Sequence, residues 1–130
     1  MSDDTETLVQ KIKRANHIPW DNPYQGTDKK VLFVCSAGIL RSATAARLYA
    51  RKYNTRSAGS ADYALIPVTN ELLLWADEVV FVNAENHENT CAEFNLDAYE
   101  TKVVVLDIPD RYPHMAPELV SHFEEQYEPL

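Results

Sequence analysis

One stretch of the sequence combines a nucleophile, a glycine and an arginine at a spacing suited to phosphate chemistry. It has the pattern C-x5-R-S and reads Cys35-Ser36-Ala37-Gly38-Ile39-Leu40-Arg41-Ser42. A short loop that leads into a helix directs backbone N–H groups at a bound anion, near the positive end of the helix dipole. Gly38 allows the backbone conformation that such a loop needs, and Arg41 offers a planar fork that matches two phosphate oxygens. The pattern therefore predicts a phosphate-binding loop.

The cysteine at the start of this loop is the predicted nucleophile. The positive field of the loop favours the thiolate form of Cys35, which is the form that attacks phosphorus. We expect the Ser42 hydroxyl to hydrogen-bond this thiolate. The residues predicted to bind the substrate are Ser36, Ala37, Gly38, Ile39, Leu40, Arg41 and Ser42. The alternative is a buried structural cysteine with a surface arginine, because cysteine is among the most buried residue types.

A segment near the C-terminus offers the proton that a leaving group needs. It follows the last predicted strand and reads Leu106-Asp107-Ile108-Pro109-Asp110-Arg111-Tyr112. The carboxyl ends of parallel strands share one edge of a sheet, so we expect Asp110 on the same edge as Cys35. A positioned carboxylic acid contributes roughly 100- to 10,000-fold in rate. Asp107 is the rival acid because it lies closer to the strand end, and either aspartate could instead cap a turn before a proline.

Two tyrosines are candidates for the wall of a substrate cleft. Tyr63 and Tyr112 could flank the ring of an aromatic phosphate ester. Partial burial in the core is the equal alternative for each ring. Tyr112 is the one that we assign to substrate binding.

These residues need a parallel sheet to bring them together. Apolar runs without polar alternation are typical of strands covered on both faces. Such runs, with one weaker candidate at 55–58, occur at 31–34, 78–82 and 102–106. Helix-like segments lie at about 40–53, 69–76, 85–97 and 117–127. This alternation predicts an α/β three-layer sandwich around a four-stranded parallel sheet, with the phosphate-binding loop between the first strand and the first core helix.

Composition and charge exclude several classes of protein. The chain has 130 residues, of which 45% are hydrophobic and 25% charged, as expected of one globular domain. A formal net charge of −8 argues against nucleic-acid binding, which needs a basic face. We find no apolar run long enough to span a membrane and no signal peptide at the acidic N-terminus. The four histidines include no pair with metal-ligand spacing, so we expect no metal and no cofactor.

The remaining expectations concern compartment and the N-terminus. Two cysteines cannot form a disulfide framework, so we expect a reducing, cytoplasmic location. The second cysteine, Cys91, is expected to face the sheet as a small apolar residue. Residues 1–30 are expected to form a short amphipathic helix over 5–16 and an irregular connector, before a domain over 31–130.

Residues 31–46, VLFVCSAGILRSATAA, resemble the active-site region of the low-molecular-weight protein tyrosine phosphatases, and of their small bacterial branch most closely. Three later segments match in family order: RSAG at 56–59, ADEVVFV at 76–82 and LDIPDRY at 106–112. The resemblance implies a Cys35 nucleophile that forms a phosphocysteine intermediate, with Arg41 clamping the phosphoryl oxygens. It also implies that Ser42 supports the thiolate and that Asp110 is the general acid. The substrate would be a phosphorylated protein or a small phosphomonoester.

Other functions stay open beside this resemblance. The segment from Cys35 to Gly38 also resembles the phosphate loop of sugar-transport IIB phosphocarriers of the lactose/cellobiose type, which lack the arginine and a downstream acid. An arsenate reductase of the same fold needs two further redox cysteines in one segment, and only Cys91 is available. A module that holds a phosphorylated partner without turnover is the third alternative. Family members usually carry Gly then Asn at the positions of Ala37 and Gly38, so this loop is unusual.

Overall fold

Strands and helices alternate along the part of the chain that the structure describes. The computed structural model describes residues 29–38 and 40–129, so the helix expected over 5–16 and its connector lie outside the described residues. In chain order the elements are β1 (Lys30–Cys35), α2 (Arg41–Leu48), β2 (Asn54–Gly59), α3 (Asn70–Trp75), β3 (Glu78–Phe81), α4 (Ala84–Glu93), a 3-10 turn (Leu96–Ala98), β4 (Lys102–Val105) and α5 (Pro117–Gln126).

The four strands form one parallel sheet in the order β2-β1-β3-β4. The α/β class and the four-stranded parallel sheet predicted from the sequence are therefore confirmed. The register pairs Cys35 with Gly59 of β2, Val34 with Phe81 of β3, and Phe81 with Val105 of β4. The four carboxyl ends therefore lie along one edge, where segments far apart in the sequence meet.

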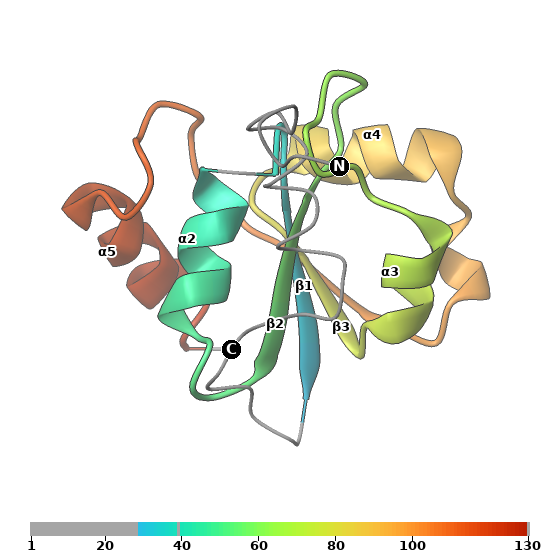
Figure 1. The fold of residues 1–130 in the computed structure, drawn as a ribbon, viewed down its shortest axis with the longest axis horizontal. Coiled ribbons are helices and arrows are strands. Elements are labelled where there is room, and N and C mark those ends of the chain that lie inside the picture. Colours follow the sequence, from blue (N-terminus) through green and yellow to red (C-terminus); the bar gives the residue numbers. More distant parts are fainter. Residues whose placement is uncertain (1–28, 39, 130) are drawn as a thin grey trace, which may run out of the picture.

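Helices cover both faces of this sheet, in an arrangement consistent with a sandwich. Helices α2 and α5 lie on one face, and α3 and α4 lie on the other (Figure 1). Two small residues of α2, Ala45 and Ala46, are buried and allow the helix to approach the sheet closely. Among the described residues, no helix is long and apolar enough to cross a membrane.

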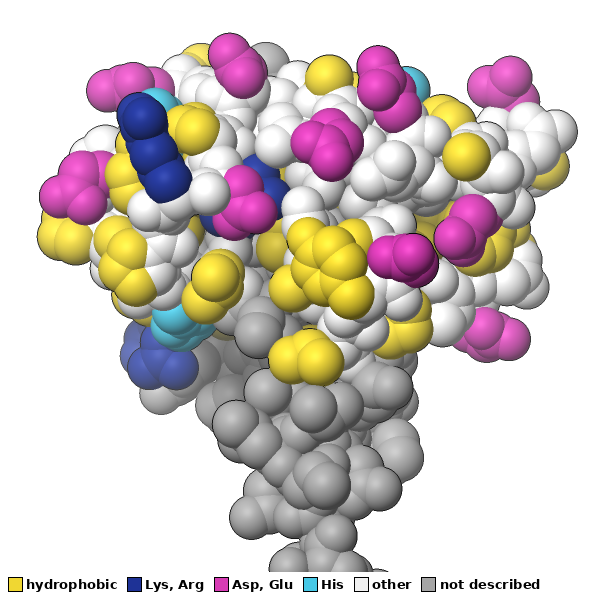
Figure 2. Space-filling view, turned by 90° about the horizontal axis from the view of Figure 1, so that it is seen from above, with side chains coloured by type: hydrophobic (Ala, Val, Ile, Leu, Met, Phe, Trp, Pro, Cys, Tyr) yellow, Lys and Arg dark blue, Asp and Glu magenta, His cyan; other side chains and the backbone are white. Residues whose placement is uncertain are grey.

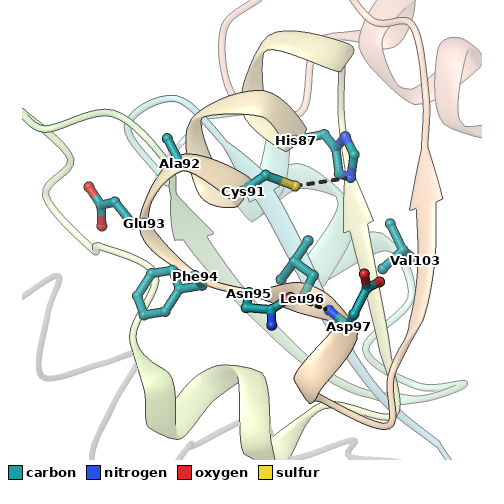
Figure 3. Close-up of a pocket in the computed structure, with 9 residues that line it drawn as sticks. All are labelled: His87, Cys91, Ala92, Glu93, Phe94, Asn95, Leu96, Asp97 and Val103. Carbon is teal, nitrogen blue, oxygen red and sulfur yellow. Dashed lines mark hydrogen bonds between the residues drawn. The ribbon is translucent and has the colours of Figure 1, made fainter.

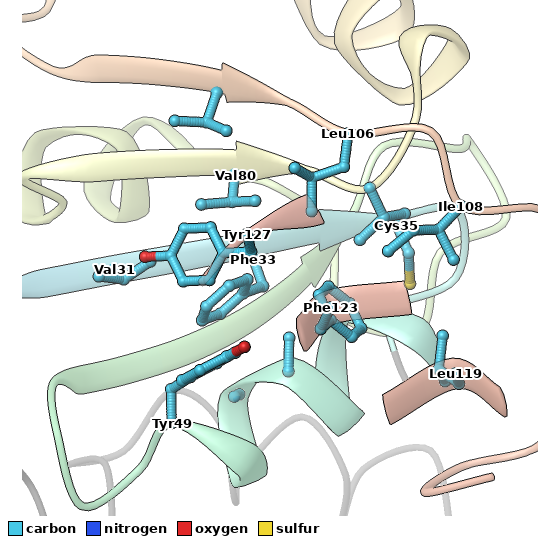
Figure 4. Close-up of a cluster of buried hydrophobic side chains, with 14 of the residues drawn as sticks. Val31, Phe33, Cys35, Tyr49, Val80, Leu106, Ile108, Leu119, Phe123 and Tyr127 are labelled. Atoms are coloured by element: carbon cyan, nitrogen blue, oxygen red, sulfur yellow. The ribbon is translucent and has the colours of Figure 1, made fainter. Parts of the chain in front are cut away.

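The larger core cluster lies under α2 and α5 and is rich in aromatic rings (Figure 4). Phe33 of β1 stacks on Tyr49 with ring centroids 5.9 Å apart, and it meets Phe123 and Tyr127 of the C-terminal region edge-to-face at 6.3 and 5.5 Å. Cys35 closes this cluster at the carboxyl end of β1. The tight packing fixes where β1 ends, and therefore where the loop after it begins.

Strand β4 departs from the sequence prediction because it is the edge of the sheet. Val103 and Val105 are exposed, whereas Val104 between them is buried. The apolar run at 102–106 had predicted cover on both faces. That prediction was wrong because α4 contacts β3, so one face of β4 stays open.

Two helices are shorter than their sequence patterns predicted. Helix α2 ends at Leu48, and the chain continues to Tyr53 through turns whose N–H groups bond to Tyr49 and Arg47. Helix α4 ends at Glu93 because Phe94 is extended, with φ −128° and ψ 139°. The 3-10 turn that follows has its own cap, since the Asn95 side chain accepts a hydrogen bond from the N–H of Asp97.

Candidate functional site

The thiol of Cys35 lies at the carboxyl edge of the sheet, where β1 leads into α2. Its side chain is 2% exposed. The Cys35 Sγ lies 3.0 Å from the Ser42 Oγ, and the backbone N–H of Gly38 donates to the sulfur at 3.2 Å. The sulfur therefore lies within hydrogen-bond distance of a side-chain hydroxyl and accepts from a backbone amide.

Two glycines allow the loop after Cys35 to pack against the end of β2. Gly38 has φ +86°, a left-handed conformation that other residues rarely adopt. A Cβ atom on Gly38 would lie 2.7 Å from the backbone nitrogen of Gly59. A Cβ atom on Gly59 would in turn lie 2.6 Å from the carbonyl carbon of Ala37. Neither contact can be relieved by a side chain, so both positions require glycine.

The guanidinium of Arg41 is the central cation of the site. Arg41 is the first residue of α2, and only 1% of its surface is exposed. Its Nη1 donates to the Ile108 carbonyl at 2.9 Å, and its Nη2 donates to the Ser36 Oγ at 3.1 Å. The Nε lies 3.5 Å from the Asp110 Oδ1 and makes no hydrogen bond. A buried cation with unused donor capacity is suited to a bound oxyanion.

The segment that carries Asp110 is attached to α2. It is held at Ile108 by Arg41, and at Met115 by a backbone N–H that donates to the Thr44 Oγ1 at 2.8 Å. Met115 has φ 61° and is the described non-glycine residue in the left-handed region. Between these attachments the Asp110 side chain is 56% exposed. The Asp110 carboxylate is therefore open to solvent, while the segment that carries it is anchored on both sides.

The rival acid, Asp107, is held elsewhere. Its backbone N–H donates to the Gln126 Oε1 at 2.6 Å, and its carbonyl accepts from the Gln126 Nε2 at 2.9 Å. These two bonds fix the Asp107 backbone to the last turn of α5. The structure therefore brings Asp110, and not Asp107, to the guanidinium of Arg41.

The other residues predicted to bind substrate are placed unevenly. Leu40 is exposed at the start of α2, and Ala37 is half-buried in the loop. Ile39 lies outside the described residues. Tyr112 is half-buried against the core, and its hydroxyl hydrogen-bonds the His122 Nε2 at 3.1 Å. The polar end of Tyr112 is therefore bound to α5, and the sequence did not predict this contact.

Two polar residues join the site that sequence reasoning did not select. Asn86 lies in the first turn of α4, is fully buried, and donates through its Nδ2 to the Ser36 Oγ at 3.2 Å and to the Ser60 Oγ at 3.0 Å. Ser60 directly follows β2, and its backbone N–H donates to the Cys35 carbonyl at 2.8 Å. The available signal was positional, since both residues lie shortly after predicted strand ends.

The surface around the site is acidic. Figure 2 looks onto the edge at which the strands end and shows many Asp and Glu side chains but few Lys or Arg side chains. Three carboxylates, those of Asp62, Glu85 and Asp110, lie on segments joined to the loop or to Arg41. An anion approaching this face gains little from long-range attraction, so its binding depends on direct contacts with the buried cation.

Comparisons of the chain with protein-family models, with curated proteins and with solved structures gave no match. The resemblance to the low-molecular-weight phosphatases therefore rests on the four segments quoted above. The chemistry of the site rests on the geometry around Cys35 and Arg41.

A second candidate site is a pocket of about 600 Å³ lined by α4, the 3-10 turn that follows it and β4 (Figure 3). It is lined by His87, Cys91, Ala92, Glu93, Phe94, Asn95, Leu96, Asp97 and Val103. Cys91 is exposed here with its Sγ 3.4 Å from the His87 Nε2, so the prediction that Cys91 faces the sheet was wrong. Thr90, its neighbour in the helix, is buried instead. Within 29–38 and 40–129, no three His, Cys, Asp or Glu side chains are grouped to hold a metal ion.

Proposed function

We propose that this protein is a cysteine-dependent phosphomonoester hydrolase of the low-molecular-weight protein tyrosine phosphatase type. The observation that carries the proposal is the pairing of a hydrogen-bonded Cys35 thiol with a buried Arg41 guanidinium whose Nε makes no hydrogen bond. In this proposal the segment between β1 and α2 is the phosphate-binding loop. A cytoplasmic location fits two cysteines that are both free thiols.

The first chemical step is attack of the Cys35 thiolate on phosphorus. The sulfur–phosphorus bond forms as the bond to the ester oxygen breaks, and Asp110 donates a proton to the departing oxygen. Arg41 stabilises the charge on the equatorial phosphoryl oxygens, which in phosphoryl transfer supplies much of the rate. The Ser42 hydroxyl and the Gly38 N–H stabilise the sulfur while it carries negative charge.

The second step is hydrolysis of the phosphocysteine. The Asp110 carboxylate takes a proton from a water molecule, whose oxygen attacks phosphorus as the sulfur–phosphorus bond breaks. The Cys35 thiolate leaves with the electron pair, and inorganic phosphate is released. The hydrogen bonds from Ser42 and Gly38 then stabilise the leaving thiolate, as they did the attacking one.

An aromatic phosphate ester, and phosphotyrosine in a protein above all, is the proposed substrate. The loop at 60–66 runs beside the cysteine loop, because the N–H of Leu65 donates to the Ala37 carbonyl at 3.2 Å. Tyr63 of this loop and Leu40 at the start of α2 are both exposed. They offer apolar surface to an aromatic ring whose phosphoryl group is bound by Arg41.

A phosphate-binding module without turnover is the second candidate. It is favoured by the burial of Cys35 at 2% exposure and by the ion pair between Asp110 and Arg41. A general acid must reach the departing oxygen of a substrate, whereas the Asp110 carboxylate here lies beside Arg41. Such a module, or a phosphocysteine carrier, needs the loop and Arg41 but no working acid.

Hydrolysis of p-nitrophenyl phosphate in the presence of EDTA separates these candidates. We expect metal-independent turnover by the wild type, complete loss in Cys35→Ser, and full activity in Cys91→Ser. Cys91→Ser is the matched control because it makes the same chemical change at the exposed cysteine of α4. Full activity in Cys35→Ser would reject the proposed nucleophile.

Binding measured by calorimetry completes the test. Cys35→Ser should still bind inorganic phosphate, since Arg41 and the loop stay in place. A folded wild type that binds phosphate or vanadate without turnover would reject the hydrolase and favour the binding module. A folded wild type that binds neither anion would reject both candidates.

A further inference from the structure

A chain of hydrogen bonds crosses the carboxyl edge of the sheet from one side to the other. It starts at the Ile108 carbonyl after β4, which accepts from the Arg41 Nη1 at 2.9 Å. The Arg41 Nη2 donates to the Ser36 Oγ after β1 at 3.1 Å, and the same oxygen accepts from the Asn86 Nδ2 at 3.2 Å. Asn86, which follows β3, then donates to the Ser60 Oγ after β2 at 3.0 Å. Every strand of the sheet is therefore connected to this chain at its carboxyl end.

Ser36 is the one polar side chain between Cys35 and Arg41, because the other positions carry Ala, Gly, Ile and Leu. Its hydroxyl oxygen accepts from Arg41 and from Asn86, which together use both of its lone pairs. Ser36 is therefore the one residue between Cys35 and Arg41 whose own side chain can form a hydrogen bond. Any group that fixes Ser36 also fixes one arm of the guanidinium.

Asn86 makes no use of its side chain within its own helix. The cap of α4 is formed by Asn83, whose side chain accepts from the backbone N–H of Asn86 at 3.1 Å. The Asn86 amide is 0% exposed, and the two hydrogen bonds that it makes both go to serines of neighbouring loops. Its Oδ1 is buried without a hydrogen-bond partner. A buried amide that leaves one atom unpaired costs stability, and such costs are typically retained at functional sites.

We infer that Asn86 is a positioning residue, which orients the Arg41 guanidinium and the loop after Cys35 by holding Ser36 against Ser60. This inference rests on the proposed phosphate chemistry of the same site and adds to it the residue that sets the geometry. Asn86 does not touch the reacting atoms. It donates to the same Ser36 oxygen that accepts from Arg41, so that the guanidinium keeps one orientation before an oxyanion binds. A misplacement of about 1 Å would destroy this preorganisation and lower the rate on the order of 100-fold.

The first test compares Asn86→Ala with Thr90→Ala. Thr90 lies one turn later on α4, is also buried, and its Oγ1 has no hydrogen-bond partner. Both changes remove a buried polar side chain from the same helix, so a general effect on α4 would appear in both variants. We expect Asn86→Ala to weaken vanadate binding and lower kcat/KM for p-nitrophenyl phosphate by about 10- to 100-fold. Thr90→Ala should keep both values within about twofold, and an equal loss in the two folded variants would overturn the inference.

The second test keeps the inference falsifiable if Asn86→Ala does not fold. Ser60→Ala removes one of the two partners of Asn86 at a half-buried position, and we expect vanadate affinity to fall severalfold. Unchanged affinity in Ser60→Ala would contradict the inference. In a double-mutant cycle of Asn86→Ala with Ser36→Ala, the losses in kcat/KM or in vanadate affinity should be clearly less than additive, because both changes break the same contact. Fully additive losses would show that Asn86 does not act through Ser36.

Different results would reject the hydrolase and the positioning role of Asn86. If the wild type binds vanadate but does not turn over substrate, the hydrolase fails while Asn86 is still tested through binding. If the wild type is active and Asn86→Ala behaves as Thr90→Ala does, the positioning role fails and the hydrolase stands.

Discussion

The Arg41 Nε lies 3.5 Å from the Asp110 Oδ1, although the Arg41 side chain is 1% exposed and that of Asp110 is 56% exposed. The Arg41 guanidinium is held by two hydrogen bonds, to the Ile108 carbonyl and the Ser36 Oγ. Among the described residues, no hydrogen bond holds the Asp110 carboxylate. An oxyanion that binds to Arg41 would therefore displace the aspartate and leave the arginine in place. In the proposed reaction, substrate binding then releases the Asp110 side chain from Arg41.

This relationship predicts unequal effects for the two candidate acids. Asp110→Asn should lower kcat for phenyl phosphate by roughly 100- to 10,000-fold, because the poor leaving group needs a proton. Asp107→Asn should change kcat less than about threefold, since that residue is bound to Gln126 through its backbone. Steady-state kinetics with a series of phenyl phosphates gives the measurement. The reverse order of the two effects would assign the acid to Asp107.

Arg41 should be irreplaceable by lysine for anion binding. Wild-type protein at a phosphate concentration about 100 times its Kd should gain about 2.7 kcal/mol in stability, seen as a rise in Tm. Arg41→Lys should lose most of this gain, because a single ammonium cannot reproduce the planar fork. Arg47→Lys, at an exposed position of the same helix, is the matched control and should keep it. An undiminished rise in Arg41→Lys would remove Arg41 from the anion site.

Gly38→Ala should distort the loop after Cys35. The new Cβ would meet the backbone of Gly59 at 2.7 Å, in a left-handed conformation that alanine rarely adopts. We expect a loss of about 1–3 kcal/mol in the free energy of unfolding. Vanadate affinity should fall as well, because the Gly38 N–H would no longer point at the Cys35 sulfur. Urea unfolding and calorimetry check both, and wild-type values would show that the loop has a different conformation in solution.

A buried hydrogen bond at the opposite edge of the sheet should affect stability but not catalysis. There the Tyr127 hydroxyl donates to the buried Glu78 Oε1 at 2.6 Å, while the other oxygen of Glu78 lies 3.1 Å from the Lys29 Nζ. Tyr127→Phe removes a hydrogen bond to a buried carboxylate, so the free energy of unfolding should fall by about 1.5–3 kcal/mol. Tyr63→Phe, at an exposed position, should leave it unchanged. The catalytic parameters of Tyr127→Phe should equal those of the wild type.

Alkaline pH tests the same contact. The pKa of Tyr127 is raised above its ordinary value of 10.0, mainly by burial of the hydroxyl and secondly by its hydrogen bond to Glu78. The native state therefore keeps a proton that the unfolded chain loses above about pH 10. The contribution of Tyr127 to the free energy of unfolding is therefore fully present below about pH 10. It falls by about 1.4 kcal/mol per pH unit as the pH rises toward the native pKa. Tyr127→Phe should show a correspondingly shallower decline between about pH 10.5 and 11.5, and equal slopes would contradict the assignment.

The elements of the fold could be read from local patterns with small errors. The weak strand at 55–58 is a full strand, Asn54–Gly59, because it pairs with β1 along its whole length. The prediction was wrong where an apolar run does not show how many faces of its strand are covered by helices. The run at 102–106 has the composition of a central strand, yet β4 is an edge, and its exposure depends on where α4 packs.

Much of the candidate site was decided by spacing within a single loop. The distance of six residues from Cys35 to Arg41 fits one turn between a strand and a helix, so the two side chains come to the same edge whatever the rest of the chain does. The left-handed conformation of Gly38 belongs to the same short segment. Local sequence therefore determined the thiol, the cation and the loop that joins them.

Only the tertiary structure decided which distant residues meet that loop. The sequence favours Asp110 but leaves Asp107 as a rival, whereas in the structure Gln126 of α5 binds the backbone of Asp107 and Arg41 lies beside Asp110. Asn86 is an ordinary polar residue in the sequence until the register of β3 against β1 places its amide against Ser36. The contacts of Ser36 with Asn86 and of Arg41 with Ile108 join residues 50 and 67 positions apart. They depend on strand order, helix placement and packing, which no local pattern contains.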